Sequence, residues 1–118
     1  MARRLTRRFA LFVICLCLPL GRSALAATAE EGRRLYASRC AFCHGTAGNG
    51  DGPAGAALKP PPTNFATTDY WKQATAESIK TVIESGKAGT AMVAFKASLN
   101  AEQIDALIAH LRTFNPSP

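Results

Sequence analysis

The sequence lacks three features that would each favour a different class of protein. No stretch shows a sustained alternation of apolar and polar residues, so a β-sheet is not expected. No apolar run reaches the roughly 20 residues that a membrane-spanning helix needs. Only two histidines and four cysteines occur in 118 residues, which leaves few side chains for a structural metal site. At this length we expect one compact domain.

The first 26 residues have the three parts of a secretory signal peptide. Arginines crowd the first eight positions, an apolar run follows over 9–20, and small residues surround the end of the segment. We therefore expect cleavage near Ala26 or Ala27 and export to the periplasm. The mature domain would be 27–118, without a stable membrane span.

The leader also accounts for most of the net charge of +6. Five of the 14 basic residues and none of the 8 acidic ones lie in it, which leaves the mature chain with a net charge of +1. Binding to nucleic acid therefore loses its electrostatic support. Cys15 and Cys17 would leave with the leader, and we interpret them as small apolar residues of its hydrophobic run.

Two segments in the first two thirds of the mature chain have helical signals at their ends. Thr28 and Glu31 form a capping-box pattern for a helix that should end near Cys40. Thr75 can cap a second helix, in which apolar residues recur at helical spacing until Gly86 provides a left-handed stop.

The clearest helical pattern lies near the C-terminus. Asn100 and Gln103 form another capping-box pattern, and apolar residues recur at i, i+3, i+4 and i+7 from Ile104. The predicted class is all-α, with three to five short helices. The segment 45–74 is a long loop rich in Gly, Pro and Thr, and such a loop is uncommon unless a function or a bound group organises it.

One short motif has specific chemistry. Residues 40–44 read Cys-Ala-Phe-Cys-His, the C-x-x-C-H pattern of covalent attachment to a c-type haem. On a helical turn Cys40, Cys43 and His44 project to one side. The two thiolates could then add to the vinyl groups of the haem while the imidazole binds the iron. We expect one covalent haem c, with His44 as an axial ligand.

Three other uses of the motif fit the sequence less well. A structural zinc needs four ligands, and the only further His or Cys of the mature chain is His110. A thioredoxin-like dithiol would need strands alternating with helices, and no strand pattern is present. A disulfide between Cys40 and Cys43 would close too small a loop to stabilise the fold much, and it leaves His44 without a role.

The second axial position of the iron needs a ligand, and Met92 is the only methionine besides Met1. It lies in 86–95, a loop of mostly small residues between two predicted helices, which lets a thioether approach a flat ring. A lone methionine usually fills a core. Beside a C-x-x-C-H motif, we instead predict that Met92 binds the iron.

The order of these features resembles that of the class I monohaem c-type cytochromes, over 28–115. The stretches 50–53 and 59–65 look like those of small bacterial members. The resemblance implies the small cytochrome c fold. It also implies that a carbonyl of the proline run 60–62, with Pro61 as a candidate, accepts the Nδ1 proton of His44, and that Trp71 or its neighbour Tyr70 hydrogen-bonds a haem propionate.

The resemblance further implies that the first and last helices cross. The contact would use a small residue, an aromatic and two leucines: Gly32, Tyr36, Leu107 and Leu111. His110 stands where the family often has an aromatic, and we interpret it as a partly exposed helix residue and not as a ligand. Val93 follows Met92 where a proline is common, so the loop should be less rigid.

A haem with two protein ligands does not readily bind oxygen or peroxide, which leaves one-electron exchange. We predict an electron carrier and not an enzyme, a monomer that serves redox partner proteins of a respiratory or dehydrogenase chain. One alternative is a dedicated haem subunit of a periplasmic dehydrogenase or oxidase complex. Another is a ligand-binding or peroxidatic haem protein, which requires that Met92 is not bound to iron. Three phenylalanines are expected to line the pocket: Phe42, Phe65 and Phe95.

Overall fold

The computed structural model describes residues 24–117, and every regular element in this range is helical. The elements are α1 (Ala24–Arg39), α2 (Ala41–His44), the short 3-10 helix η1 (Gly55–Ala57), α3 (Thr68–Gln73), α4 (Ala76–Ser85) and α5 (Ala101–Arg112). The predicted all-α fold is confirmed. Most of the predicted leader lies outside the described residues, so the signal peptide and its cleavage site stay predictions.

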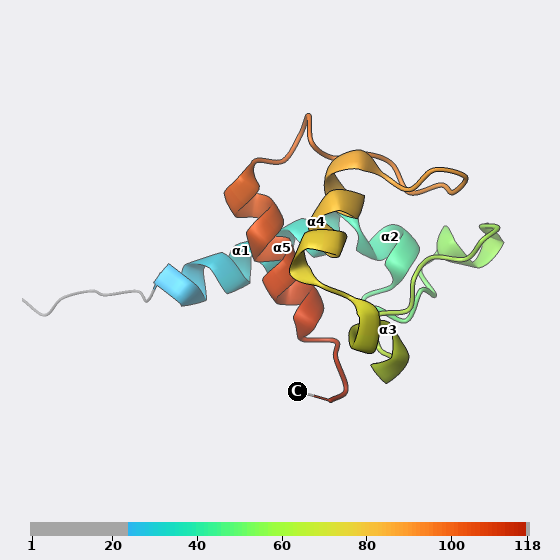
Figure 1. Ribbon diagram of the computed structural model, residues 1–118, viewed down its shortest axis with the longest axis horizontal. Coiled ribbons are helices and arrows are strands. Elements are labelled where there is room, and N and C mark those ends of the chain that lie inside the picture. The colour runs from blue at the N-terminus through green and yellow to red at the C-terminus, as the bar shows by residue number, and fades with distance from the viewer. Residues whose placement is uncertain (1–23, 118) are drawn as a thin grey trace, which may run out of the picture.

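Helices α1 and α5 cross near the centre of the molecule (Figure 1). The crossing requires Gly32, because a Cβ there would overlap the carbonyl oxygen of Ala106 and press against His110. The predicted crossing is therefore confirmed. On α5, Gly32 lies against Ala106 and His110, each one position before a predicted leucine. The leucines themselves, Leu107 and Leu111, point into the core beside Tyr36. Adjacent positions on a helix point about 100° apart.

The ends of α4 and α5 follow the predicted caps. The Thr75 hydroxyl accepts from the amide of Ser78 at 3.0 Å. The Asn100 side chain accepts from the amide of Gln103 at 2.9 Å, and both boxes have the reciprocal bond. The predicted cap at Thr28 is wrong, because α1 already begins at Ala24. The alanines before Thr28 are strong helix formers and extend the helix upstream.

The core is built around α5, which packs against α1 and against α4. It includes the predicted apolar stripe of α5, and its largest members are Tyr36, Phe65, Ile79, Ile83, Leu99, Ile104, Leu107, Ile108 and Leu111. Burial of each such side chain stabilises the fold by roughly 1.5–3 kcal/mol. Between residues 24 and 117, no helix has both the length and the apolar character to cross a membrane.

The long loop 45–74 contains two short helical pieces, η1 and α3, which the sequence did not predict. Figure 1 shows the part of this loop around η1 and the loop 86–95 projecting on the same side of the molecule, away from the start of α1. Two segments that are far apart in sequence therefore border the same region, next to α2.

Candidate functional site

The C-x-x-C-H motif begins at Cys40, between α1 and α2, and its other four residues form α2. The amide of Cys40 donates to the carbonyl of Tyr36, and the amide of His44 donates to the carbonyl of Cys40, each at 2.9 Å. This helical geometry lets the motif's two sulfurs and its imidazole share one side, as the spacing predicts. Cys40, Cys43 and His44 all line the same cavity.

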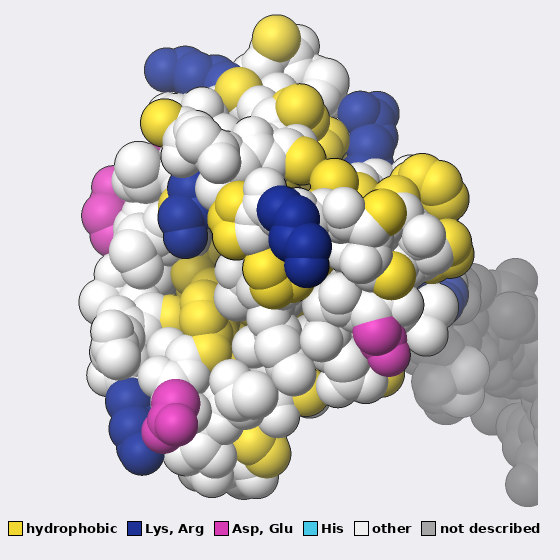
Figure 2. Space-filling view, turned by 90° about the vertical axis from the view of Figure 1, so that its right-hand side faces the viewer, with side chains coloured by type: hydrophobic (Ala, Val, Ile, Leu, Met, Phe, Trp, Pro, Cys, Tyr) yellow, Lys and Arg dark blue, Asp and Glu magenta, His cyan; other side chains and the backbone are white. Residues whose placement is uncertain are grey.

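The cavity has a volume of about 700 Å³, which lies within the usual range for cofactor sites. Its apolar wall comes from the long loop, α3, α4, the loop 86–95 and α5, and includes Leu58, Phe65, Tyr70, Ile79, Val82, Ile83, Phe95 and Leu111. Figure 2 shows hydrophobic side chains gathered in a hollow on the face where the two loops project. The shape and the lining suit a large flat apolar group.

His44 is held on two sides. Its Nδ1 lies 3.1 Å from the carbonyl oxygen of Thr63, and its ring stacks on Phe65 with a centroid distance of 4.7 Å. Burial lowers the pKa of His44, and the hydrogen bond to Thr63 opposes this effect in part. With Nδ1 occupied as a donor, Nε2 is the nitrogen left to bind a metal.

The predicted acceptor, a carbonyl of the proline run 60–62 with Pro61 as a candidate, is wrong: the contact belongs to Thr63, the residue directly after the run. The amide of Phe65 donates to the carbonyl of Gly48 at 2.7 Å, which draws the segment behind the prolines alongside His44. No sequence signal could identify Thr63, because every residue has a carbonyl group.

Cys40 and Cys43 have free thiols and are both partly buried. Burial raises the pKa of the Cys40 thiol to about 11, with Arg39 opposing the shift and Cys43 adding to it. Among residues 24–117, no group of three or more His, Cys, Asp or Glu side chains is placed to hold a metal ion. The zinc alternative therefore has no support from the described residues.

Met92 lines the same cavity from the loop 86–95. Its amide donates to the hydroxyl of Thr90 at 3.1 Å, and its carbonyl accepts from the amide of Lys87 at 3.1 Å. The Thr90 hydroxyl also donates to the carbonyl of Lys87 at 2.7 Å. Met92 is thus held by its own loop, while the next side chain, Val93, is 61% exposed.

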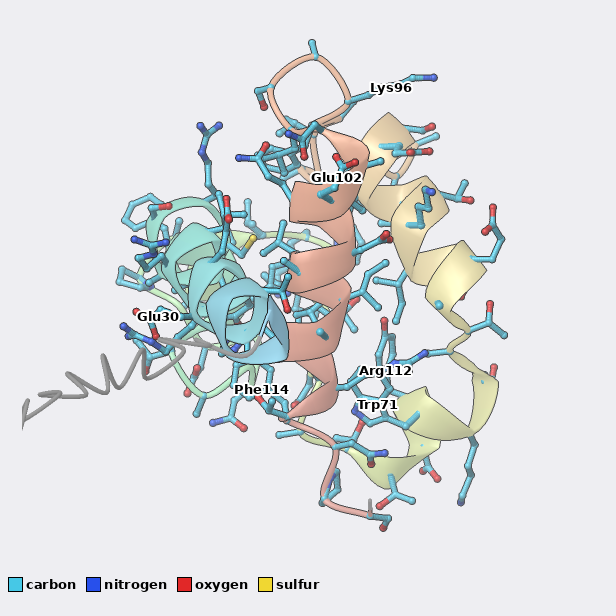
Figure 3. The ribbon with its side chains drawn as sticks, turned by 90° about the vertical axis from the view of Figure 1, so that its left-hand side faces the viewer. Glu30, Trp71, Lys96, Glu102, Arg112 and Phe114 are labelled. Atoms are coloured by element: carbon cyan, nitrogen blue, oxygen red, sulfur yellow. The ribbon has the colours of Figure 1, made fainter. Side chains whose placement is uncertain are left out.

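The prediction that Trp71 binds a haem propionate gains no support from its position. Its only donor, Nε1, already donates to the carbonyl of Phe65 at 2.6 Å, and the side chain does not line the cavity. Figure 3 shows Trp71 near the C-terminal end of α5. Tyr70 does line the cavity, and burial raises the pKa of its hydroxyl.

The three predicted pocket phenylalanines differ in their positions. Phe65 and Phe95 line the cavity, as predicted. The prediction for Phe42 is wrong, because its side chain is 68% exposed and is not part of the lining. It lies between the two cysteines of the motif, and the turn that directs them into the cavity directs Phe42 away from it.

His110 lies outside the cavity, and its interpretation as a partly exposed helix residue is confirmed. Its ring centroid is 5.0 Å from that of Tyr36 and 5.1 Å from that of Phe114. Burial lowers the pKa of His110, and the nearby charge of Arg33 adds to the shift.

One family model and two solved structures match this chain. The family described as "Cytochrome C oxidase, cbb3-type, subunit III" matches residues 27–111. The structure is similar to a chain of the "Kuenenia stuttgartiensis reducing HAO-like protein complex Kustc0457/Kustc0458", with 30% identity and a TM-score of 0.63. That match covers 73% of this chain but only 42% of the other.

A second similar structure is that of the "KustC0563 c-type cytochrome". It is 29% identical, with a TM-score of 0.61, and the match covers 71% of this chain and 96% of the other. No curated protein gives a significant match to the sequence. The structural likeness therefore includes almost the whole length of one small protein and a part of a larger one.

Proposed function

The chain belongs to the c-type cytochrome family described as "Cytochrome C oxidase, cbb3-type, subunit III", and from this premise we propose that it carries single electrons in the periplasm. Membership of this family implies one covalently bound haem c. One observation carries the proposal: a cavity of about 700 Å³ is lined by Cys40, Cys43, His44 and Met92.

These four side chains fit the chemistry of the group. Two thiols three residues apart suit thioether links to the haem, so we assign Cys40 and Cys43 to its attachment. His44 would bind the iron through Nε2, because Nδ1 is held by the Thr63 carbonyl. Met92 supplies a soft thioether from a different part of the chain.

The haem supplies a one-electron couple at its iron. The surrounding residues of the chain keep water from it, since the walls of the cavity are largely apolar. The Thr63 carbonyl makes the His44 imidazole a more basic ligand, which favours the ferric state, whereas Met92 favours the ferrous state. Two protein ligands would leave no open position for oxygen or peroxide.

A second candidate function is that of a dedicated haem subunit in a larger redox complex. The name of the family refers to an oxidase subunit, and one similar structure belongs to a protein complex. We propose a monomeric shuttle with several redox partners as the first interpretation. Purification at physiological salt distinguishes the two, because a subunit stays with one large partner and a shuttle does not.

We also propose that residues 1–26 are an export signal and that the haem domain is 27–118. The family match begins at residue 27, which supports a domain boundary at this position. The charge, the apolar run and the small residues of the leader support export.

Expression in the periplasm with the haem-attachment machinery tests the proposal. The intact mass of the wild type should correspond to residues 27–118 plus one haem. Replacing both cysteines with alanine should abolish covalent attachment. A colourless protein with free thiols or bound zinc would contradict the proposal.

The sixth ligand needs its own variant and control. Met92→Ala should remove the sulfur-to-iron charge-transfer absorption, and Val93→Ala, a change at the exposed neighbour, should retain it. Rapid binding of carbon monoxide to the ferrous wild type at neutral pH would favour the ligand-binding alternative over the electron carrier.

A further inference from the structure

Tyr36 contacts both ends of the segment 40–45. Its backbone carbonyl accepts from the amide of Cys40 at 2.9 Å. Its hydroxyl donates a hydrogen bond of 2.7 Å to the carbonyl of Gly45, the residue that follows His44. The Tyr36 residue is only 2% exposed, so water does not compete for this bond. Tyr36 therefore holds the start of the segment through its backbone and the end of the segment through its side chain.

Gly45 is a position where the backbone needs such a contact. Its φ of +82° is a conformation that glycine adopts readily and other residues rarely adopt. A Cβ at this position would overlap the carboxylate of Asp51, so a larger residue would also require that this exposed side chain turn aside. The Gly45 carbonyl accepts two hydrogen bonds, one from the amide of Gly48 at 3.1 Å within the turn and one from the Tyr36 hydroxyl, which is the bond that ties this turn to α1.

The loop 45–50 then connects this contact to His44. The amide of Gly50 donates to the carbonyl of His44 at 2.7 Å. The carbonyl of Gly48 accepts from the amide of Phe65, also at 2.7 Å. Phe65 lies two residues after Thr63, whose carbonyl faces Nδ1 of His44. A movement of the loop would therefore move both His44 and its acceptor.

The ring of Phe114, a residue that follows α5, supports the same loop. The ring of Phe114 is 5.1 Å from that of Tyr36, between centroids, and lies so close to Gly48 that a Cβ there would come within 2.7 Å of it. Figure 3 shows Phe114 beside α1, just beyond the C-terminal end of α5. The crossing of α1 and α5 is thus in contact with the loop that borders the haem site.

We propose that Tyr36 is a positioning residue for the haem site: its hydroxyl fixes the loop 45–50 and, through it, the hydrogen bond from His44 to Thr63. The inference rests on the proposed function, because it requires that His44 binds the iron. A hydrogen bond from Nδ1 to a carbonyl makes the imidazole a stronger electron donor and stabilises the ferric state. Loss of the hydroxyl should weaken that bond and raise the reduction potential.

The test is Tyr36→Phe in the haem-loaded protein, with Ile104→Val as a matched control. Ile104 on α5 is as deeply buried as Tyr36. In the described part of the chain, no hydrogen bond joins it to the loop 45–50. In the ferrous protein, exchange of the His44 Nδ1 proton with water is measured by NMR. It should become roughly threefold to tenfold faster in Tyr36→Phe, as expected for the loss of one hydrogen bond.

The reduction potential is the second measurement. It should rise in Tyr36→Phe and stay at the wild-type value in Ile104→Val, although both variants lose stability. Unchanged proton exchange and potential in haem-loaded Tyr36→Phe would overturn the role of Tyr36 and leave the proposed function intact. Equal changes in the two variants would also overturn it, since they would report lost stability and not a lost hydroxyl.

A second variant keeps the inference testable if Tyr36→Phe fails to attach haem. Phe114→Leu removes the ring that packs on Gly48 while it retains the Tyr36 hydroxyl. It should shift proton exchange and potential in the same direction by a smaller amount, and the absence of any shift would overturn the role of the loop. A wild-type protein that attaches no haem would refute the proposed function and this inference together.

Discussion

The carbonyl oxygen of Thr63 lies 3.1 Å from Nδ1 of His44 and joins two positions that are 19 residues apart. The acceptor is a backbone group, so no side-chain substitution at position 63 removes it directly. Its place depends on the segment after the prolines, which the bond from Phe65 to Gly48 ties to the motif loop. In the proposed site, the electron-donating strength of the axial imidazole is therefore set by how two loops pack together.

Phe65→Ala should destabilise the protein and admit water to the ligand. The Phe65 ring is buried and stacks on His44 with an interplanar angle of 23°. Its removal should cost about 3–5 kcal/mol of unfolding free energy, measured by urea denaturation of the haem-loaded protein. Phe42→Ala is the control, because the side chain of Phe42 is 68% exposed and its loss should cost less than about 0.5 kcal/mol. Equal losses would contradict the assigned positions.

Gly32→Ala should destabilise the protein even though alanine is the better helix former. The added Cβ overlaps the carbonyl oxygen of Ala106, so α1 and α5 must move apart, at a cost of about 1–3 kcal/mol. Ala37→Gly, at an exposed position of the same helix, should lose only the propensity difference of about 1 kcal/mol. A stabilised Gly32→Ala protein would show that the helices do not cross at this residue.

Features that depend on neighbouring residues could be predicted, and features that depend on distant packing could not. The caps at Thr75 and Asn100 use a side chain and an amide three residues apart, so the sequence contains all of the information. The contact between His44 and Thr63 depends on the path of the long loop, which no local pattern specifies. The error at Thr28 has another origin, because a capping pattern also occurs by chance inside a longer helix.

The same limit applies to the aromatic side chains of the site. Sequence indicates that Phe42, Phe65 and Trp71 are large and apolar, but not toward which side the backbone directs each of them. Phe42 is directed outward by the turn that brings the two cysteines into the cavity. Trp71 uses its donor on the Phe65 carbonyl, a choice that depends on where α3 packs.

Thr90→Val should loosen the Met92 loop. The variant removes two hydrogen bonds of the Thr90 hydroxyl, one from the Met92 amide and one to the Lys87 carbonyl. Each is worth about 1 kcal/mol, so the fraction of protein without a bound sulfur should rise by up to roughly thirtyfold. The measurement is carbon monoxide binding to the ferrous protein. Thr90→Ser retains the hydroxyl and should behave as the wild type, and equal binding in both variants would contradict this role.

His110 should make the stability of the protein depend on pH. Burial lowers its pKa from the ordinary value of 6.5, and the charge of Arg33 on α1 adds to this effect. The unfolded chain then binds a proton at a higher pH than the folded chain does. The stability contribution is complete above the ordinary value, and it is lost as the pH falls from there through the lowered pKa of the folded state.

His110→Phe tests this contribution while it retains a ring against Tyr36 and Phe114. Urea unfolding of both haem-loaded proteins from neutral to mildly acidic pH should show a steeper loss of stability in the wild type. His44 is present in both proteins, so any contribution from it cancels in the difference. Parallel curves would mean that His110 takes up its proton equally well in the folded and unfolded chains, and that the contact with α1 does not exclude its charged form.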